Sequence, residues 1–260
     1  MPKMLAELGL QRRLEHLLGQ PEGALLYGLH EGSTANPSGR RPVVVEGPLD
    51  VLAVAARAHV TGDAEMLAVA ACGTAFTITH ARRVADVAFK HQAPVVVALD
   101  GDAAGRTAAV AAGEQLRYAG LDVRVAVLPN GTDPADYLTR QNSTLDVFRD
   151  THALPLLTIR VQRAVAAQGD RMQWIEGRLA AARAIAGYLA TYPVSYAAAQ
   201  IGWIGNVLDL EAATFTFEVA AAYRQPCAPP NGARPAALIN PLDSDHAEPG
   251  RRTYEREVIT

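Results

Sequence analysis

Two apolar runs in this chain end abruptly in acidic residues. The first, Val-Val-Val at residues 43–45, is followed by Glu46. The second, at residues 95–99, is followed by Asp100 and Asp102. Carboxylates that lie close together repel one another unless a cation sits between them. A hard divalent ion such as Mg2+ or Mn2+ takes oxygen ligands and keeps positions open for water and phosphate. These acids therefore predict metal-dependent phosphate chemistry.

A regular alternation of strands and helices would bring these acids together. Apolar runs typical of strands occupy residues 42–46, 67–71, 95–99 and 123–128, and helical patterns occupy residues 49–58, 79–91 and 103–119. This order predicts an α/β fold, in which helices flank a parallel sheet with right-handed crossovers. The carboxyl ends of parallel strands meet at one edge of the sheet, where ligands bind. Two further acids, Asp133 and Asp136, follow the fourth predicted strand and come to the same edge.

The chain changes character on both sides of this α/β region. Residues 1–41 carry a leucine periodicity and then a loop rich in Ser, Pro and Gly, which predicts a helical lead-in and linker. The α/β domain spans residues 42–140, and the Ala-rich residues 141–224 carry helical spacing without strand alternation. That stretch predicts a small α-helical region after the sheet. The polar, Pro-rich residues 225–260 predict a disordered tail.

Composition narrows the classes of function. The 260 residues carry a formal net charge of −3, so contact with nucleic acid requires a local basic patch. The two cysteines, Cys72 and Cys227, are far apart, and no zinc site is expected. No apolar run is long enough to cross a bilayer, and the first residues lack the apolar core of a signal peptide. We therefore expect a cytoplasmic protein without a membrane partner.

Five short motifs occur in the order found in DnaG-type bacterial primases. They are Leu-Tyr-Gly-Leu at 26–29, Val-Glu-Gly-Pro-Leu-Asp-Val at 45–51, Gly-Thr-Ala at 73–75, Asp-Gly-Asp-Ala-Ala-Gly-Arg at 100–106 and Leu-Pro-Asn-Gly-Thr-Asp-Pro-Ala-Asp at 128–136. One such motif is a weak signal, but five in order are specific, and this part of the chain resembles the catalytic core of these primases. The resemblance implies a Toprim domain, the metal-binding fold that primases share with topoisomerases and some nucleases. It also implies Mg2+ or Mn2+ as the cofactor.

The resemblance implies roles for particular residues as well. The catalytic acids are Glu46, Asp100 and Asp102. The metal ligands are Asp100, Asp102, Asp133 and Asp136. The residues expected to contact nucleotide or phosphate are Gly47, Gly101 and Arg106, with Asp50 in a supporting position. Glu46 has two roles open to it: it transfers a proton to or from the attacking hydroxyl, or it supports a metal through water.

Simpler structural roles are open for several of these residues. Asp102 lies where it would cap the helix expected from residue 103. Asp50 is placed as a solvated acid in the first turn of its helix, where it would favour the helix dipole. Asp133 precedes a proline and is a common turn residue. Arg106 lies one turn into its helix, where it would contact phosphate or pair with a carboxylate.

Together these features predict an enzyme that makes short RNA primers from ribonucleotides on single-stranded DNA during replication. Two alternatives remain: a Toprim nuclease that hydrolyses phosphodiesters with the same acids, and a non-catalytic module that binds metal or nucleic acid and needs a partner. Primases of this type also carry a zinc-binding module and a basic subdomain that holds the template. The chain has neither the cysteines for the first nor enough residues before Glu46 for the second. The expected partners therefore include a replicative helicase or a separate template-binding subunit.

Overall fold

The fold is described from a computed structural model of the chain. The described residues are 25–29, 41–63, 66–71, 75–91, 93–140, 144–149 and 152–225. They divide into two compact units, one ending at Arg163 and one beginning at Ala164. Most of the expected lead-in, the Gly-Thr pair at 73–74 and the expected tail from residue 226 lie outside the described residues.

Within its described residues, the first unit contains a five-stranded sheet with the order β2-β1-β3-β4-β5. The strands are β1 (Arg41–Val45), β2 (Met66–Ala70), β3 (Val95–Val97), β4 (Val123–Val125) and β5 (Leu154–Pro155). The pairs β1–β2, β1–β3 and β3–β4 are parallel, which confirms the predicted fold class. β5 pairs antiparallel with β4 and was not predicted, because a strand of two residues is too short to show alternation.

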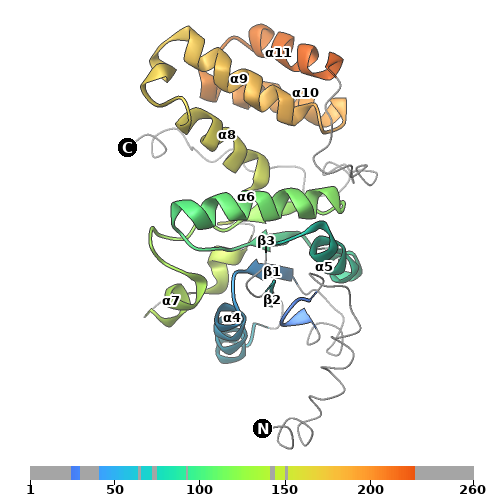
Figure 1. Cartoon of the computed structure of the whole chain (residues 1–260), viewed down its shortest axis with the longest axis vertical. Helices are drawn as coiled ribbons and strands as arrows, with labels where there is room; N and C mark the ends of the chain where they lie inside the picture. Colours follow the sequence, from blue (N-terminus) through green and yellow to red (C-terminus); the bar gives the residue numbers. More distant parts are fainter. Residues whose placement is uncertain are drawn as a thin grey trace, which may run out of the picture. The chain divides into compact units, whose positions relative to one another are not determined.

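Helices cover both faces of this sheet (Figure 1). One face carries α5 (Ile78–His91) and α6 (Ala103–Tyr118), and the other carries α4 (Pro48–Thr61), α7 (Pro134–Thr139) and the 3-10 turn η1 (Leu145–Phe148). Pro48 occupies the first turn of α4, where its fixed φ suits a helix start. This two-sided arrangement leaves the carboxyl ends of the parallel strands uncovered by crossover helices and open to ligands.

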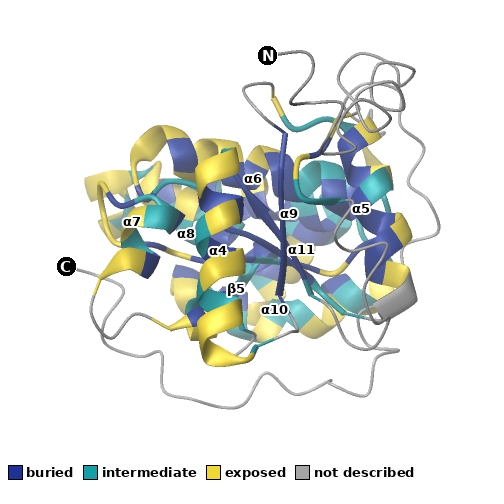
Figure 2. Ribbon diagram, turned by 90° about the horizontal axis from the view of Figure 1, so that it is seen from below, coloured by how far each residue is buried: buried dark blue, intermediate teal, exposed yellow. Residues whose placement is uncertain are grey.

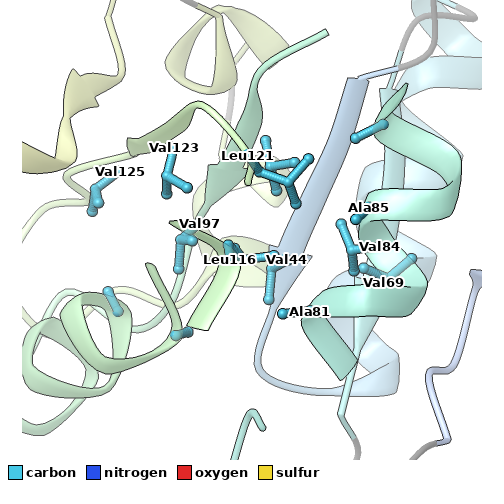
Figure 3. Close-up of a cluster of buried hydrophobic side chains, with 14 of the residues drawn as sticks. Val44, Val69, Ala81, Val84, Ala85, Val97, Leu116, Leu121, Val123 and Val125 are labelled. Carbon is cyan, nitrogen blue, oxygen red and sulfur yellow. The ribbon is translucent and has the colours of Figure 1, made fainter. Parts of the chain in front are cut away.

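Alternating side chains along the central strands build two apolar layers. Val44 and Val97 point toward α5 and α6 (Figure 3), whereas Val43, Val45 and Val96 belong to the layer under α4 and α7. All five side chains are at most 2% exposed. Figure 2 shows the strands as a buried interior between helices whose outer faces are exposed. Strands buried on both faces are continuously apolar, which is why Val-Val-Val triplets mark both β1 and β3.

The Leu-Tyr-Gly-Leu motif at residues 26–29 lies along the edge of the sheet beside β2. The N–H of Tyr27 donates to the carbonyl of Ala70 at 2.9 Å, and the N–H of Ala70 donates back at 3.1 Å. Gly28 adopts a φ of +87°, and a Cβ at this position would lie 2.3 Å from the carbonyl oxygen of Ala68. Only glycine allows both the left-handed conformation and this close approach, so this motif has a structural role.

The second unit is helical, as the Ala-rich pattern predicts. It contains η2 (Gly169–Gln173), α9 (Ile175–Leu189), α10 (Val194–Leu208) and α11 (Ala212–Arg224), and α8 (Leu156–Ala166) precedes them across the boundary between the units. Its most deeply buried large side chains are Ile185, Leu189, Ile204, Leu208 and Phe215. No helix among the described residues combines the length and the apolar character needed to cross a membrane.

Candidate active site

Three acids lie where two neighbouring strands end. Glu46 directly follows β1, and Asp100 and Asp102 lie in the loop that follows β3. β1 and β3 are parallel, with Val44 opposite Val97, so the two loops leave the sheet at the same edge. Glu46 and Asp102 are exposed, and Asp100 is half-buried. This edge therefore presents carboxylates to solvent.

Asp100 is surrounded by negative charge. Its pKa is raised from 3.8 to about 6, first because burial disfavours the charged form and then because Glu46, Asp133, Asp50 and Asp102 lie near it. These carboxylates come from the loops after β1, β3 and β4 and from the start of α4. The structure therefore brings together acids that lie far apart in the sequence.

Two of the predicted metal ligands also cap helices. Asp102 accepts a hydrogen bond from the N–H of Gly105 at 2.7 Å at the start of α6. Asp133 accepts one from the N–H of Asp136 at 2.6 Å at the start of α7. The capping role considered for Asp102 is confirmed, and Asp133 has the same role in addition to its place in a turn. Asp136 is exposed. Its charge raises the pKa of Asp50, but it is not among the charges that raise the pKa of Asp100.

Asp50 is buried, with 7% of its surface exposed. Its Oδ2 accepts a hydrogen bond from the N–H of Gly47 at 3.0 Å, and its Oδ1 accepts one from the N–H of Ala135 at 3.1 Å. Burial raises the pKa of Asp50, the two backbone bonds lower it, and the charges of Asp133 and Asp136 raise it again. The interpretation of Asp50 as a solvated acid was wrong, because the pattern of α4 alone carries no sign that α7 packs over this position.

The loops after β3 and β4 are joined through their backbones. The N–H of Gly101 donates to the carbonyl of Thr132 at 2.9 Å. A Cβ on Gly101 would lie 2.1 Å from the carbonyl oxygen of Pro129, well inside van der Waals contact. Gly101 is itself buried, so glycine is required here for the close approach of the two loops.

Two exposed arginines lie over this junction. The guanidinium of Arg106 donates to the carbonyl of Gly101, and that of Arg140 donates to the hydroxyl of Thr132 at 2.9 Å. Arg106 was expected to contact phosphate or to pair with a carboxylate. Within the described part of the chain, it forms no ion pair with a carboxylate. Arg140 was not predicted as a site residue, because an exposed arginine after a helix matches no motif. Its place four residues after Asp136 is the one signal that could have indicated it.

The carboxylate oxygens of these acids are the kind of ligand that a hard divalent cation prefers, although the acids are not arranged as a complete metal site. Over the described ranges, no three Asp, Glu, His or Cys side chains are arranged as a group ready to hold a metal ion. Mg2+ is commonly held by one or two carboxylates together with water and substrate phosphates. A cation beside Asp100 would relieve the repulsion that raises the pKa of this group. The residues present therefore fit an ion that is completed by its substrate.

A cavity of about 570 Å³ lies elsewhere in the first unit, at the far end of α4. Its lining residues are Thr61, Gly62, Asp63, Thr144, Leu145, Asp146 and Arg149. Arg149 pairs with Asp63 at 2.6 Å and with Asp146 at 3.3 Å, so these charges are already compensated. None of the predicted site residues lines this cavity. The candidate site therefore lies at the edge of the sheet and not in this cavity.

Comparison with known proteins agrees with this geometry. Residues 43–138 match the protein family described as Toprim-like. These residues form a Toprim domain. The match includes all the acids at the strand ends, from Glu46 to Asp136.

This Toprim domain resembles the catalytic core of DnaG primases. The chain is 32% identical over 161 residues to a DNA primase of Halalkalibacterium halodurans, an alignment that covers 60% of this chain and 25% of that primase. A DNA primase domain from Pseudomonas aeruginosa superposes with a TM-score of 0.59 at 28% identity and covers 77% of this chain and 60% of that one. The DnaG primase catalytic domain bound to single-stranded DNA superposes with a TM-score of 0.53 at 26% identity, over 75% of this chain and 59% of that one. The chain spans about a quarter of the length of the primases it matches.

Proposed function

We propose that this chain carries the nucleotidyl-transfer centre of a DnaG-type primase, an enzyme that makes short RNA primers on single-stranded DNA during replication. The observation that carries the proposal is the convergence of carboxylates on Asp100, whose pKa rises to about 6 because of its burial and because of the charges of Glu46, Asp102 and the acids of two other segments. Like charges placed together destabilise a fold. Their gathering at the ligand-binding edge of a Toprim sheet therefore supports a catalytic purpose.

Mg2+ or Mn2+ is the cofactor that these acids would hold. Asp100 and Asp102 offer oxygens from the loop after β3, and Asp133 and Asp136 offer oxygens from the loop after β4 and the first turn of α7. The ion, when bound, neutralises the charge on the nucleotide phosphates and on the departing pyrophosphate. The capping bonds of Asp102 and Asp133 hold these two carboxylates at fixed positions before any ion binds.

Glu46 is the acid that we assign either to proton transfer or to support of the metal through water. In primer extension, the 3′-hydroxyl of the growing strand attacks the α-phosphate of a ribonucleotide, the bond to pyrophosphate breaks, and the hydroxyl proton must leave. Glu46 is exposed at the end of β1 and close enough to Asp100 to raise its pKa. It accepts that proton directly or supports the metal through water. Arg106, an exposed residue whose guanidinium donates to the carbonyl of Gly101, is the residue that we assign to phosphate binding.

The proposed substrates are single-stranded DNA as template and ribonucleotides as monomers. The DnaG catalytic domain that superposes on this chain was solved with single-stranded DNA bound. A net charge of −3 offers no general basic surface for the template. We therefore propose that a separate template-binding subunit or a replicative helicase acts as partner, and that the protein works in the cytoplasm, where template and ribonucleotides meet.

A primer-synthesis assay tests the proposal. It uses single-stranded DNA, labelled ribonucleotides and Mg2+ or Mn2+, and it compares the wild-type chain with the Asp100→Ala/Asp102→Ala double variant. The matched control is Asp170→Ala/Glu176→Ala, which removes two exposed acids of the helical unit. Short RNA products that vanish in the first variant and persist in the control would support the proposal.

Two other outcomes would overturn primer synthesis by this chain on its own. Cleavage of the DNA without RNA synthesis would favour the Toprim nuclease. Absence of any product, while calorimetry still detects metal binding, would favour a module that needs a partner for activity.

A further inference from the structure

We propose that Asp50 is a positioning residue, which holds the loop after β1 and the start of α7 at a fixed separation and thereby sets the spacing of the carboxylates at the candidate active site. This inference rests on the proposed function and names a device within the same site. Asp50 itself is buried, so its role is to place other residues and not to touch the substrate.

The hydrogen bonds of Asp50 connect two segments that are distant in the sequence. Oδ2 accepts from the N–H of Gly47, three residues before it, and Oδ1 accepts from the N–H of Ala135, 85 residues after it. The two distances are 3.0 and 3.1 Å, so each oxygen makes an ordinary bond to a different segment. One rigid carboxylate therefore bridges the two backbones.

Both bonded amides are direct neighbours of acids assigned to the site. Gly47 follows Glu46, and Ala135 lies between Asp133 and Asp136. A displacement of either loop would move these carboxylates relative to one another. Because metal and substrate sites tolerate errors of only about 0.5 Å in their ligands, a bridge at this point governs the geometry of the site more directly than packing elsewhere.

A purely local role for Asp50 accounts for only half of its contacts. The bond to Gly47 is one half of a capping box at the start of α4: the N3 carboxylate accepts from the N-cap N–H, and Gly47 has no side chain to make the other half. A capping box can operate at an exposed helix end and needs no second partner. The bond to Ala135 and the burial of the charge are additional, and burying a carboxylate is unfavourable unless it is well hydrogen-bonded. The second bond and the burial of the charge indicate that Asp50 connects the loop after β1 to the start of α7.

The chain offers a matched control for this idea. Arg57, two turns further along α4, donates from its guanidinium to the carbonyl of Leu138 near the end of α7. This bond joins the same two helices as Asp50 does, but it lies away from the carboxylates. A variant that removes it weakens the packing of α7 on α4 without touching the first turn of α7. Arg57→Met is suitable, because it keeps most of the apolar stem and removes the donor.

The test compares Asp50→Asn with Arg57→Met in the full chain. Calorimetry measures Mn2+ affinity, amide hydrogen exchange followed by NMR measures protection of Gly47 and Ala135, and primer synthesis is measured over a range of Mg2+ concentrations. For Asp50→Asn we expect faster exchange at Ala135, Mn2+ affinity reduced about 10- to 100-fold and primer synthesis partly restored by excess Mg2+. For Arg57→Met we expect a lower melting temperature with unchanged Mn2+ affinity.

A second variant approaches the bridge from the donor side. Ala135→Pro removes the N–H that donates to Asp50 and leaves the carboxylate in place, and the N–H groups of the first turn of α7 have no acceptor within the helix. It should reduce Mn2+ affinity as Asp50→Asn does. This variant decides the matter if Asp50→Asn does not fold.

Several results would overturn the inference. One is Mn2+ affinity that stays unchanged in both Asp50→Asn and Ala135→Pro. Another is an equal loss of affinity in Arg57→Met, which would reduce Asp50 to one of several structural contacts. If the wild-type chain binds Mn2+ without making primers, the primase assignment alone fails, and the affinities of the variants still decide the role of Asp50. If it binds no Mn2+, the proposed function fails, and the exchange of Ala135 decides whether Asp50 holds the two loops.

Discussion

Two groups of acidic side chains in this chain have opposite surroundings. Two acids of the helical unit lie beside arginines: Asp209 pairs with Arg178 at 2.5 Å, and Glu218 pairs with Arg183 at 3.2 Å. At the carboxyl edge of the Toprim sheet, the acids lie beside other acids. Asp100 makes no ion pair with any residue in the described ranges, and four carboxylates act on it.

The two arrangements of charge have opposite effects on the stability of the fold. Pairing opposite charges is neutral or slightly favourable for stability, so the helical unit is arranged as folding alone would arrange it. Gathering like charges opposes folding and is expected only where a ligand later compensates for it. On the proposed function, the edge of the sheet is the part of this molecule whose stability is reduced in favour of binding.

The largest expected effect is on activity. Asp100→Asn should reduce kcat/KM for primer synthesis by more than about 100-fold, because even residues that only support a metal ligand account for about 10- to 100-fold. Asp209→Asn, which also replaces one aspartate by its amide but in the helical unit, should leave activity within experimental error. Equal losses in the two variants would remove the functional difference between the two surfaces.

The next effect concerns the backbone junction behind the acids. Gly101→Ala should lower the free energy of unfolding by about 1–3 kcal/mol, the usual cost of overpacking, because its Cβ would meet the carbonyl oxygen of Pro129 at 2.1 Å. Gly187→Ala in α9 is the matched control, since an added Cβ there meets nothing within 4 Å. This control should gain about 0.5–1 kcal/mol, because alanine favours a helix over glycine. Urea denaturation measures both, and the same sign in both variants would contradict the expectation.

A smaller effect is the dependence of stability on pH. In the folded chain the pKa of Asp100 is about 6, above its ordinary value of 3.8, so folding favours the protonated form. Between pH 3.8 and about 6 the unfolded chain releases this proton while the folded chain keeps it, so the free energy of unfolding falls as the pH rises. The wild-type chain should therefore lose stability relative to Asp100→Asn as the pH rises through this window, with no difference below it. Urea denaturation at several pH values measures the difference, and a gap that is independent of pH would show that the repulsion is absent.

The smallest effect is expected for a paired charge. Arg183→Ala removes the partner of Glu218, in a pair whose arginine side chain is 65% exposed and whose glutamate side chain is 12% exposed, and it should lower the free energy of unfolding by about 0.2–1 kcal/mol. The loss should shrink at high salt, because exposed pairs are screened. A loss above this range, or one that salt does not change, would mean that the helical unit depends on its ion pairs more than its exposure suggests.

Much of the sheet and its acidic edge could be predicted from the sequence, because the signals are local. Apolar runs buried on both faces marked the four parallel strands, and the acids directly after them had to lie at one edge. The strand β5 was missed because two residues carry no period. Arg140 was missed because its contact with Thr132 depends on how a loop folds back, which no spacing encodes.

The sequence by itself determined the order in which the parallel strands and their helices follow one another along the chain. It also placed Glu46, Asp100 and Asp102 at the ends of strands. Both results depend on periodicity and chain direction, which neighbouring residues determine. The tertiary structure alone decided which acids act on one another and why Gly101 is glycine. It also turned Asp50 from an expected solvated acid into a buried bridge to Ala135. The physical reason is that burial and hydrogen bonding between residues 85 positions apart depend on how two helices pack on the same face of the sheet, and the pattern of either helix alone does not contain this information.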